Sequence, residues 1–206
     1  MVYIKKGIEP QSLEYFRLST PNATYDGLPT EYKDEIRERL LSEQGSICAY
    51  CMGRIGMNTV TIEHYIPQSN DTLHEHDLEY KNMLGVCSGH QYMHETCGKS
   101  RKNAPLTVDP RDRDSVGSIT YSEDGSILSS DALILRDLNE VLNLNTGILK
   151  ENRRRSLHRM IAELQGQKKK GLWRNLAIKY MKKLNENDVK QEYYGILLFY
   201  LEKKMR

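Results

Sequence analysis

The sequence predicts an α+β protein, in which a small metal-pinned module of two strands and a helix sits within a mostly helical frame. Two observations support this class. All four cysteines and five of the six histidines fall between Cys48 and Asn103. Apolar residues recur at helical spacing before this stretch and again after about Ala132. We therefore expect three parts: an N-terminal extension and helix over residues 1–47, the metal-pinned core over 48–110, and a β-hairpin followed by helices over 111–206.

The composition is lean in hydrophobic residues, at 38%, and charged residues make up 28% of the chain. A lean core makes a structural metal more useful, because small modules otherwise bury too little apolar surface. No apolar stretch is long enough to cross a bilayer, and the first residues lack the apolar core of a signal peptide. We therefore expect a cytoplasmic protein. Thiols stay reduced in that compartment, so clustered cysteines favour metal ligation over disulfides.

Turn residues and periodicity predict the elements of the first half. Residues 1–29 are expected to be extended and then irregular. Thr30 is expected to cap a helix that stops at Gly45. A strand is expected over residues 60–66, and a short helix is expected to start over residues 99–103 and to be cut short by Pro105.

In the second half, residues 118–128 predict a β-hairpin around an Asp-Gly turn. Two amphipathic helices follow, one with its apolar stripe between Leu149 and Leu164 and the other between Leu172 and Leu184. The basic loop 165–171 is expected to separate them. The apolar run from Tyr193 to Leu201 predicts a final helix.

The four cysteines can surround one Zn²⁺ tetrahedrally: Cys48, Cys51, Cys87 and Cys97. A site closed by four thiolates has no open position and is structural. Nine residues separate Cys87 from Cys97, which is wider than a tight zinc ribbon, but the ligands need only converge in space. A thioredoxin-like redox pair is the alternative for Cys48 and Cys51, although no βαβ pattern surrounds them. We expect structural zinc.

An acid and a histidine, Glu63 and His64, lie at the end of the predicted strand. Hydrolysis of a phosphodiester needs a base for water and a cation to offset charge on the phosphate. The imidazole of His64 titrates near working pH, and Glu63 suits a hard ion such as Mg²⁺. Taken alone, such a pair is usually an ordinary surface or core histidine beside an acid, but the flanking cysteines favour the chemical interpretation.

Asn82 follows at a strand-like turn. Its amide can hydrogen-bond backbone and hold the two strands in register. On spacing alone, an ordinary turn asparagine explains it equally well.

These residues together resemble the HNH endonuclease family, with its ββα-metal fold. Glu63 and His64 match the first histidine position, Asn82 matches the central asparagine, and the cysteines match the zinc pairs of many members. The resemblance implies a metal-dependent endonuclease that hydrolyses phosphodiester bonds in DNA, although the choice between DNA and RNA stays open. It implies that His64 is the general base, Glu63 a ligand of Mg²⁺ or another divalent cation, and Asn82 a structural support.

One position departs from the family pattern. In many members a His or Asn directly follows the last cysteine and binds the catalytic metal, whereas Gly98 stands here. His90, His94 and Asn103 are the candidates for the missing ligand. We favour His90, because it comes just past Cys87, where the loop must return to the site. A solvated loop histidine is the alternative interpretation of His90 and His94.

Basic residues offer contacts to a nucleic acid. Arg101 and Lys102, with Asn103, follow the last cysteine at a predicted helix start, where cations and backbone N–H groups could meet phosphate. The runs at residues 153–155 and 168–170 could track a nucleic-acid backbone, and a solvated helix face explains them equally well.

A narrower resemblance runs nearly end to end, to bacterial HNH proteins of the Septu anti-phage type (PtuB-like nuclease subunits). It is carried by residues 3–7, 43–51, 62–64 with Pro67, and 142–145 followed by Leu149 and Arg153. It implies an ABC/AAA-type ATPase partner that docks on the helical C-terminal region. Two other functions stay open: a zinc-ribbon module that binds nucleic acid or an ATPase without cleaving, and an adaptor that binds the ATPase through residues 193–201.

Overall fold

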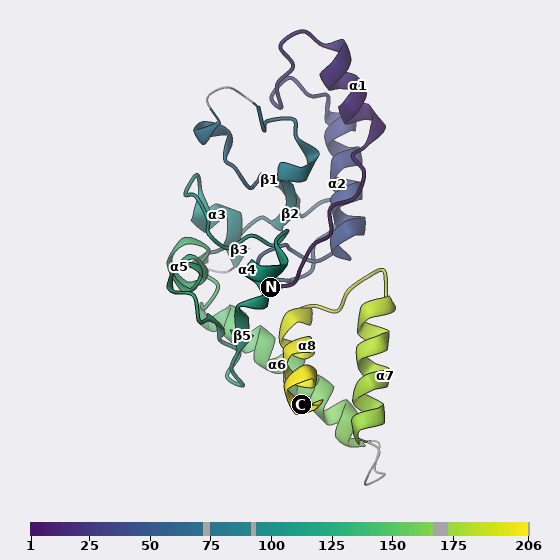
Figure 1. The fold of residues 1–206 in the computed structure, drawn as a ribbon, viewed down its shortest axis with the longest axis vertical. Helices are drawn as coiled ribbons and strands as arrows, with labels where there is room; N and C mark the ends of the chain where they lie inside the picture. The colour runs from purple at the N-terminus through teal and green to yellow at the C-terminus, as the bar shows by residue number, and fades with distance from the viewer. Residues whose placement is uncertain (72–74, 92–93, 167–172, 206) are drawn as a thin grey trace.

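The computed structural model describes residues 1–71, 75–91, 94–166 and 173–205. Two helices lie at one end of the molecule: α1 (Gln11–Ser19) and α2 (Thr30–Gln44). Three helices lie at the other end (Figure 1): α6 (Gly147–Gly166), α7 (Trp173–Glu186) and α8 (Tyr194–Met205). The cysteine-rich part of the chain lies between them. The mixed α+β class predicted from the sequence is confirmed.

The centre of the molecule contains an antiparallel pair of strands, β1 (Val60–His64) and β2 (Met83–Cys87). Val60 pairs with Cys87 at one end of the ladder, and His64 pairs with Met83 at the other. Helix α2 packs against both strands, and helix α3 (Cys97–Arg101) packs against β2. A loop of eighteen residues, 65–82, joins β1 to β2, and two further short strands lie between β2 and α3.

Short elements fill the rest of the chain. Two 3₁₀ turns lie in the loop between β1 and β2: η1 (Gln68–Asn70) and η2 (Tyr80–Asn82). Two further strand pairs are antiparallel: β3 (His90–Gln91) with β4 (His94–Glu95), and β5 (Ile119–Tyr121) with β6 (Ile127–Ser129). The second pair is the predicted hairpin. The remaining turns of helix are α4 (Arg113–Gly117), α5 (Ala132–Arg136) and the π-helical η3 (Asp137–Val141).

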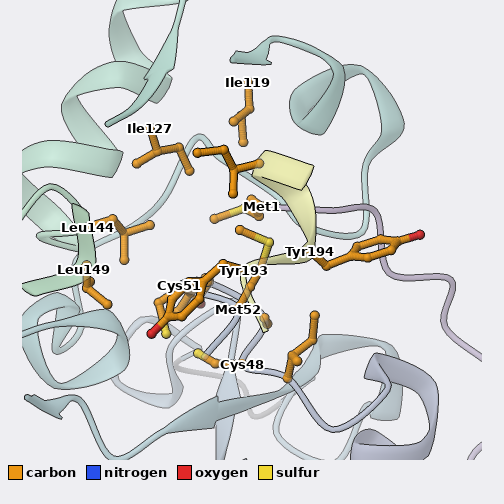
Figure 2. Packing of buried hydrophobic residues seen from close by; sticks show 14 of the residues in the cluster. Met1, Cys48, Cys51, Met52, Ile119, Ile127, Leu144, Leu149, Tyr193 and Tyr194 are labelled. Carbon is orange, nitrogen blue, oxygen red and sulfur yellow. The ribbon is translucent and has the colours of Figure 1, made fainter. Parts of the chain in front are cut away.

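One hydrophobic cluster joins the cysteine turn to the C-terminal helices. Figure 2 shows Tyr193 beside Cys51 and Met52. The Tyr193 N–H donates to the Met52 carbonyl at 2.9 Å, and the Gly195 N–H lies 3.2 Å from the Met52 sulfur. A Cβ on Gly195 would lie 2.6 Å from the Tyr121 hydroxyl, so α8 reaches the core only because that position has no side chain.

The burial of α8 corrects one expectation. Leu197 and Leu201 have no exposed surface, and Ile196 is 1% exposed. The apolar run from Tyr193 to Leu201 is therefore mainly part of the core and does not form a free docking helix for a partner, as the adaptor interpretation required.

A second cluster ties the N-terminal part to the same strands. It contains residues of α1 and α2 together with residues of β1, β2 and the loop between them: Leu13, Leu28, Ile36, Leu40, Ile62, Leu78, Tyr80 and Met83. Helix α1 falls where an irregular segment was expected. Thr30 is the first residue of α2 and makes no capping bond, because Pro29 is the N-cap. The stop at Gly45 is confirmed by its left-handed φ of 65°.

The helices expected after residue 132 are confirmed, with the apolar stripe of α6 buried at Leu149, Leu157, Met160 and Leu164. The basic loop expected between α6 and α7 lies mostly outside the described residues. Within the part of the chain that the structure describes, no helix combines the length and the apolar character needed to span a membrane.

Candidate active site and metal centre

The four cysteine sulfurs converge on one point. Their Sγ atoms all lie within 4.8 Å of one another, and the Cys48–Cys97 and Cys51–Cys87 pairs are each 3.9 Å apart. An ion bound tetrahedrally at about 2.3 Å from each sulfur would separate the sulfurs by about 3.8 Å. Two sulfur pairs already have this separation, so the cluster could hold one metal ion such as zinc once the wider pairs close by up to about 1 Å. The predicted convergence of the four cysteines is confirmed, and the β3–β4 hairpin takes up the wide spacing between Cys87 and Cys97.

A buried glutamine fixes the cysteine turn to its neighbours. The Gln44 amide nitrogen donates to the carbonyls of Ile47 and Gly85 at 2.9 and 2.7 Å, and its oxygen accepts from the Gly85 N–H at 2.7 Å. One side chain thus joins the end of α2, the start of the cysteine turn and β2. The sequence interpretation missed Gln44, since a glutamine at a helix end usually faces solvent.

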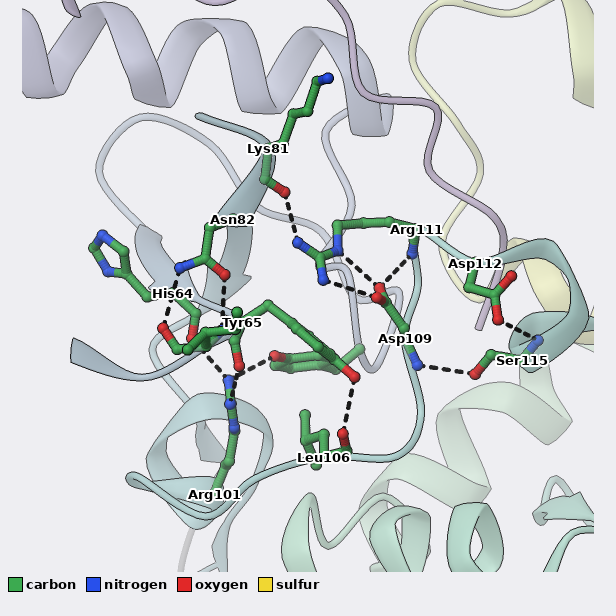
Figure 3. Close-up of polar contacts among 12 residues, drawn as sticks. His64, Tyr65, Lys81, Asn82, Arg101, Leu106, Asp109, Arg111, Asp112 and Ser115 are labelled. Atoms are coloured by element: carbon green, nitrogen blue, oxygen red, sulfur yellow. Dashed lines mark hydrogen bonds and ion pairs between the residues drawn. The ribbon is translucent and has the colours of Figure 1, made fainter. Parts of the chain in front are cut away.

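Arg101 is the centre of a buried polar network (Figure 3). Its side chain has no exposed surface, and Nη1 donates to Glu63 Oε1 at 2.8 Å, to the His64 carbonyl at 3.0 Å and to the Tyr50 hydroxyl at 3.2 Å. The same guanidinium also donates to the Tyr65 carbonyl through Nη2 and to the Ala104 carbonyl through Nε. Arg101 therefore holds the end of β1 instead of facing solvent, which differs from the phosphate contact expected for it.

Glu63 lies at the edge of this network, with 15% of its side chain exposed. Burial raises the pKa of its carboxyl group, and the Arg101 guanidinium acts in the opposite direction. A Cβ placed on Gly98 would lie only 2.7 Å from Glu63 Oε2. The residue that follows the last cysteine is thus a direct neighbour of the Glu63 carboxylate, and the absence of a side chain at Gly98 leaves room for it.

This contact makes Gly98→Ala informative. An alanine is normally favoured over glycine within a helix by up to about 1 kcal/mol. Here we expect net destabilisation of about 1–3 kcal/mol, because the added Cβ displaces Glu63 and leaves the buried Arg101 short of an acceptor. Urea unfolding measures this change. Gly117→Ala, where nothing lies within 4 Å of the added Cβ, is the control. The Gly98→Ala/Glu63→Ala double variant should lose less unfolding free energy than the two single variants lose together. Strictly additive losses would contradict a contact between the two residues.

His64 is buried, with 8% of its surface exposed. Its Nε2 lies 2.9 Å from the Asp77 carbonyl oxygen. A carbonyl can only accept, so Nε2 carries the hydrogen and Nδ1 carries the lone pair of the neutral ring. Burial lowers the pKa of this imidazole, which favours the neutral form. The Tyr25 ring meets it edge-to-face, with centroids 4.7 Å apart and planes at 85°.

Asn82 links the two ends of the loop that joins β1 to β2 (Figure 3). Its Oδ1 accepts from the Ile66 N–H at 2.7 Å, and its Nδ2 donates to the Ile66 and His76 carbonyls at 3.1 and 3.2 Å. Asn82 is 2% exposed. Asp71 supports the same loop by accepting from the N–H groups of Glu75 and His76. The loop behind His64 is therefore held by side-chain bonds to its backbone.

The remaining candidate residues are more dispersed. His94 is exposed on β4, and Lys102 and Asn103 are exposed just after α3. The backbone of His90 lies in β3, but its side chain lies outside the described residues, so its predicted role as a metal ligand stays a prediction. Among the residues that the structure describes, the four cysteines are the only set of three or more Cys, His or acidic side chains close enough to share an ion.

The fold and the site together define an α+β protein with a four-cysteine cluster and, at the end of β1, a partly buried Glu63 held by Arg101 and a buried His64 held by Asp77. No protein-family model matches the chain. A relative from Vibrio cholerae serotype O1 biovar El Tor is 24% identical over 143 residues, which span 66% of this chain and 70% of the relative. Its name is "Retron Vc95 putative HNH endonuclease". This likeness supports an HNH type of family for the chain and does not extend to the Septu type.

Proposed function

We propose that the protein is a metal-dependent HNH endonuclease that hydrolyses phosphodiester bonds in DNA. The observation that carries this proposal is the state of His64. Its Nε2–H is bonded to the Asp77 carbonyl, and its Nδ1 makes no hydrogen bond with a described residue. An imidazole held in this way keeps a single tautomer and a fixed direction for its lone pair, which is what a general base requires.

In this proposal, Nδ1 of His64 accepts the proton of the attacking water. Three carboxylates, those of Asp77, Asp71 and Asp26, raise the pKa of the ring and so oppose the effect of burial. They would stabilise the imidazolium that forms when the proton arrives. The Asp77 carbonyl keeps its hydrogen bond throughout, since Nε2 remains protonated in both states.

Glu63 would hold the catalytic divalent ion, Mg²⁺ or another. One carboxylate is sufficient protein ligation for Mg²⁺ when waters and substrate phosphate complete its shell, and the bound ion would offset negative charge at the phosphate. Arg101 already bonds Oε1 of Glu63, which fixes the carboxylate and leaves Oε2 facing Gly98. His90 stays our candidate for a second ligand.

The four-cysteine cluster would hold structural zinc. The turn at residues 48–51 contributes two of the four thiolates, those of Cys48 and Cys51, and the Tyr50 hydroxyl that contacts Arg101. An ion bound to this turn would therefore also hold the Arg101 network that positions Glu63. Asn82 would serve as the structural support of the loop behind His64. Lys102 and Asn103 are exposed near this site and would contact the DNA backbone.

The relative's retron association and the sequence resemblance to Septu-type proteins support a role in anti-phage defence. We propose that the chain works there as the nuclease subunit of a complex with an ABC/AAA-type ATPase. Because most of the apolar run from Tyr193 to Leu201 is buried, we assign docking of the ATPase to the exposed faces of residues 111–206.

The assay is incubation of the pure protein with supercoiled plasmid, single-stranded DNA and RNA in Mg²⁺, Mn²⁺ or EDTA. We expect divalent-dependent nicking of DNA. Glu63→Gln keeps the shape and loses the charge, so half-maximal cleavage should need at least about tenfold more Mg²⁺. The control is Glu79→Gln, because Glu79 is exposed and pairs with His76. Identical Mg²⁺ titrations for Glu63→Gln and the wild type would contradict the assignment.

A further inference from the structure

The segment before α2 covers the imidazole of His64. Residues 20–29 form no regular element, and they contribute one ring to the site, that of Tyr25. This ring is the aromatic partner of His64, edge-to-face at a centroid distance of 4.7 Å. Such pairs prefer this geometry and are worth about 0.5–1.5 kcal/mol beyond area burial. A change of the χ1 rotamer of His64 would move the imidazole out of this contact.

The backbone of the same residue is tied to the loop that orients His64. The Tyr25 N–H donates to Asp77 Oδ2 at 2.7 Å, and Gln68 Nε2 donates to Asp77 Oδ1 at 2.5 Å. The carbonyl of that same Asp77 accepts from His64 Nε2. Tyr25 therefore reaches His64 twice, through its ring directly and through its N–H by way of Asp77.

Helix α2 supports the ring from the other direction. Lys33 Nζ lies 4.8 Å from the centroid of the Tyr25 ring, within the range of a cation–π contact. Tyr25 itself is partly buried, and burial raises the pKa of its phenol. The Tyr25 ring therefore lies in a defined position between Lys33 of α2 and the imidazole of His64.

We propose that Tyr25 is a positioning residue that locks the rotamer of His64, so that the segment before α2 completes the active site. The proposal rests on the proposed nuclease function, because it assigns Tyr25 a role through His64. The aromatic ring is the acting group and the phenol hydroxyl is not, since the contact is between ring and ring.

The test compares Tyr25→Ala with Tyr25→Phe in the full chain. Both keep the N–H that binds Asp77, and only alanine removes the ring. We expect Tyr25→Ala to lower kcat for plasmid nicking about tenfold to a hundredfold through misplacement of the base. KM should stay within about twofold, and Tyr25→Phe should behave as wild type. Tyr15→Ala, which removes a tyrosine that is 64% exposed on α1, is the matched control.

A second readout does not depend on cleavage. Nitrogen NMR of the His64 ring should report a single Nε2–H tautomer in the wild type and in Tyr25→Phe, and averaged ring signals in Tyr25→Ala. Wild-type kcat in Tyr25→Ala, or unchanged His64 ring signals, would overturn the proposal. A wild-type protein that cleaves nothing would count against the nuclease function, and the ring signals would then decide the role of Tyr25.

Discussion

Replacing His64 with alanine is expected to abolish divalent-dependent nicking, by a factor of about 10²–10⁴ or more, because general-base catalysis of this kind contributes that much. The ring also makes one hydrogen bond and one aromatic contact, so alanine would lower stability as well. His64→Gln separates the two effects, because its amide can still donate to the Asp77 carbonyl but has no basic nitrogen to accept a proton. We expect His64→Gln to fold as wild type and to be equally inactive.

The control for this experiment is His76→Ala. His76 belongs to the loop that supports His64, but its side chain is more exposed than that of His64 and its ring pairs with Glu79. We expect it to retain activity. If His64→Gln nicks plasmid as fast as wild type, the nicking does not depend on this imidazole, and the assignment of His64 as the general base is wrong.

Removing one cysteine is the second change with a large expected effect. Structural zinc sites contribute apparent binding free energies of about 10–16 kcal/mol, which matches or exceeds the 5–15 kcal/mol by which domains of this size are folded. We therefore expect Cys48→Ser to lose bound zinc and cooperative unfolding of the central region. Metal analysis by mass spectrometry should find about one zinc per wild-type chain, and thermal unfolding measures the loss of structure.

His94→Ala is the matched control for the cysteine variant, because His94 lies three residues before Cys97 and is exposed. It should retain zinc and unfold as wild type. A Cys48→Ser protein with a full complement of zinc would show that these four thiols do not form the metal centre, and the redox interpretation of Cys48 and Cys51 would then need testing.

The features that could be predicted from the sequence are those that depend on residue spacing and on the chemistry of single side chains. The four cysteines could be grouped because clustered thiols that stay reduced are used mainly for metal binding. Helix α2, the β5–β6 hairpin and helix α6 followed from periodicity and turn residues. Helix α1 was missed, since only Leu13 of its nine residues is fully buried and the apolar stripe is too weak to recognise.

The supporting network could not be predicted, because its contacts join residues distant in sequence. Arg101 was interpreted as a phosphate contact on the basis of its charge, whereas it binds Glu63, which lies thirty-eight positions earlier in the sequence. Tyr25 and Asp77 are fifty-two residues apart and carry no motif of their own. The burial of Leu197 could not be predicted from the sequence either, because an apolar helix can pack against a partner protein or against its own core.

The contact between Met52 and Gly195 spans 143 residues. During synthesis on the ribosome, the turn that carries Cys48 and Cys51 emerges long before the helix that covers it. Contacts of such high sequence separation carry a large loop-closure entropy cost, which slows folding. The cysteine turn cannot be covered by α8 until the residues around Gly195 have been synthesised. The core around the cysteine turn would therefore be complete, and the site assembled, only after α8 has been translated.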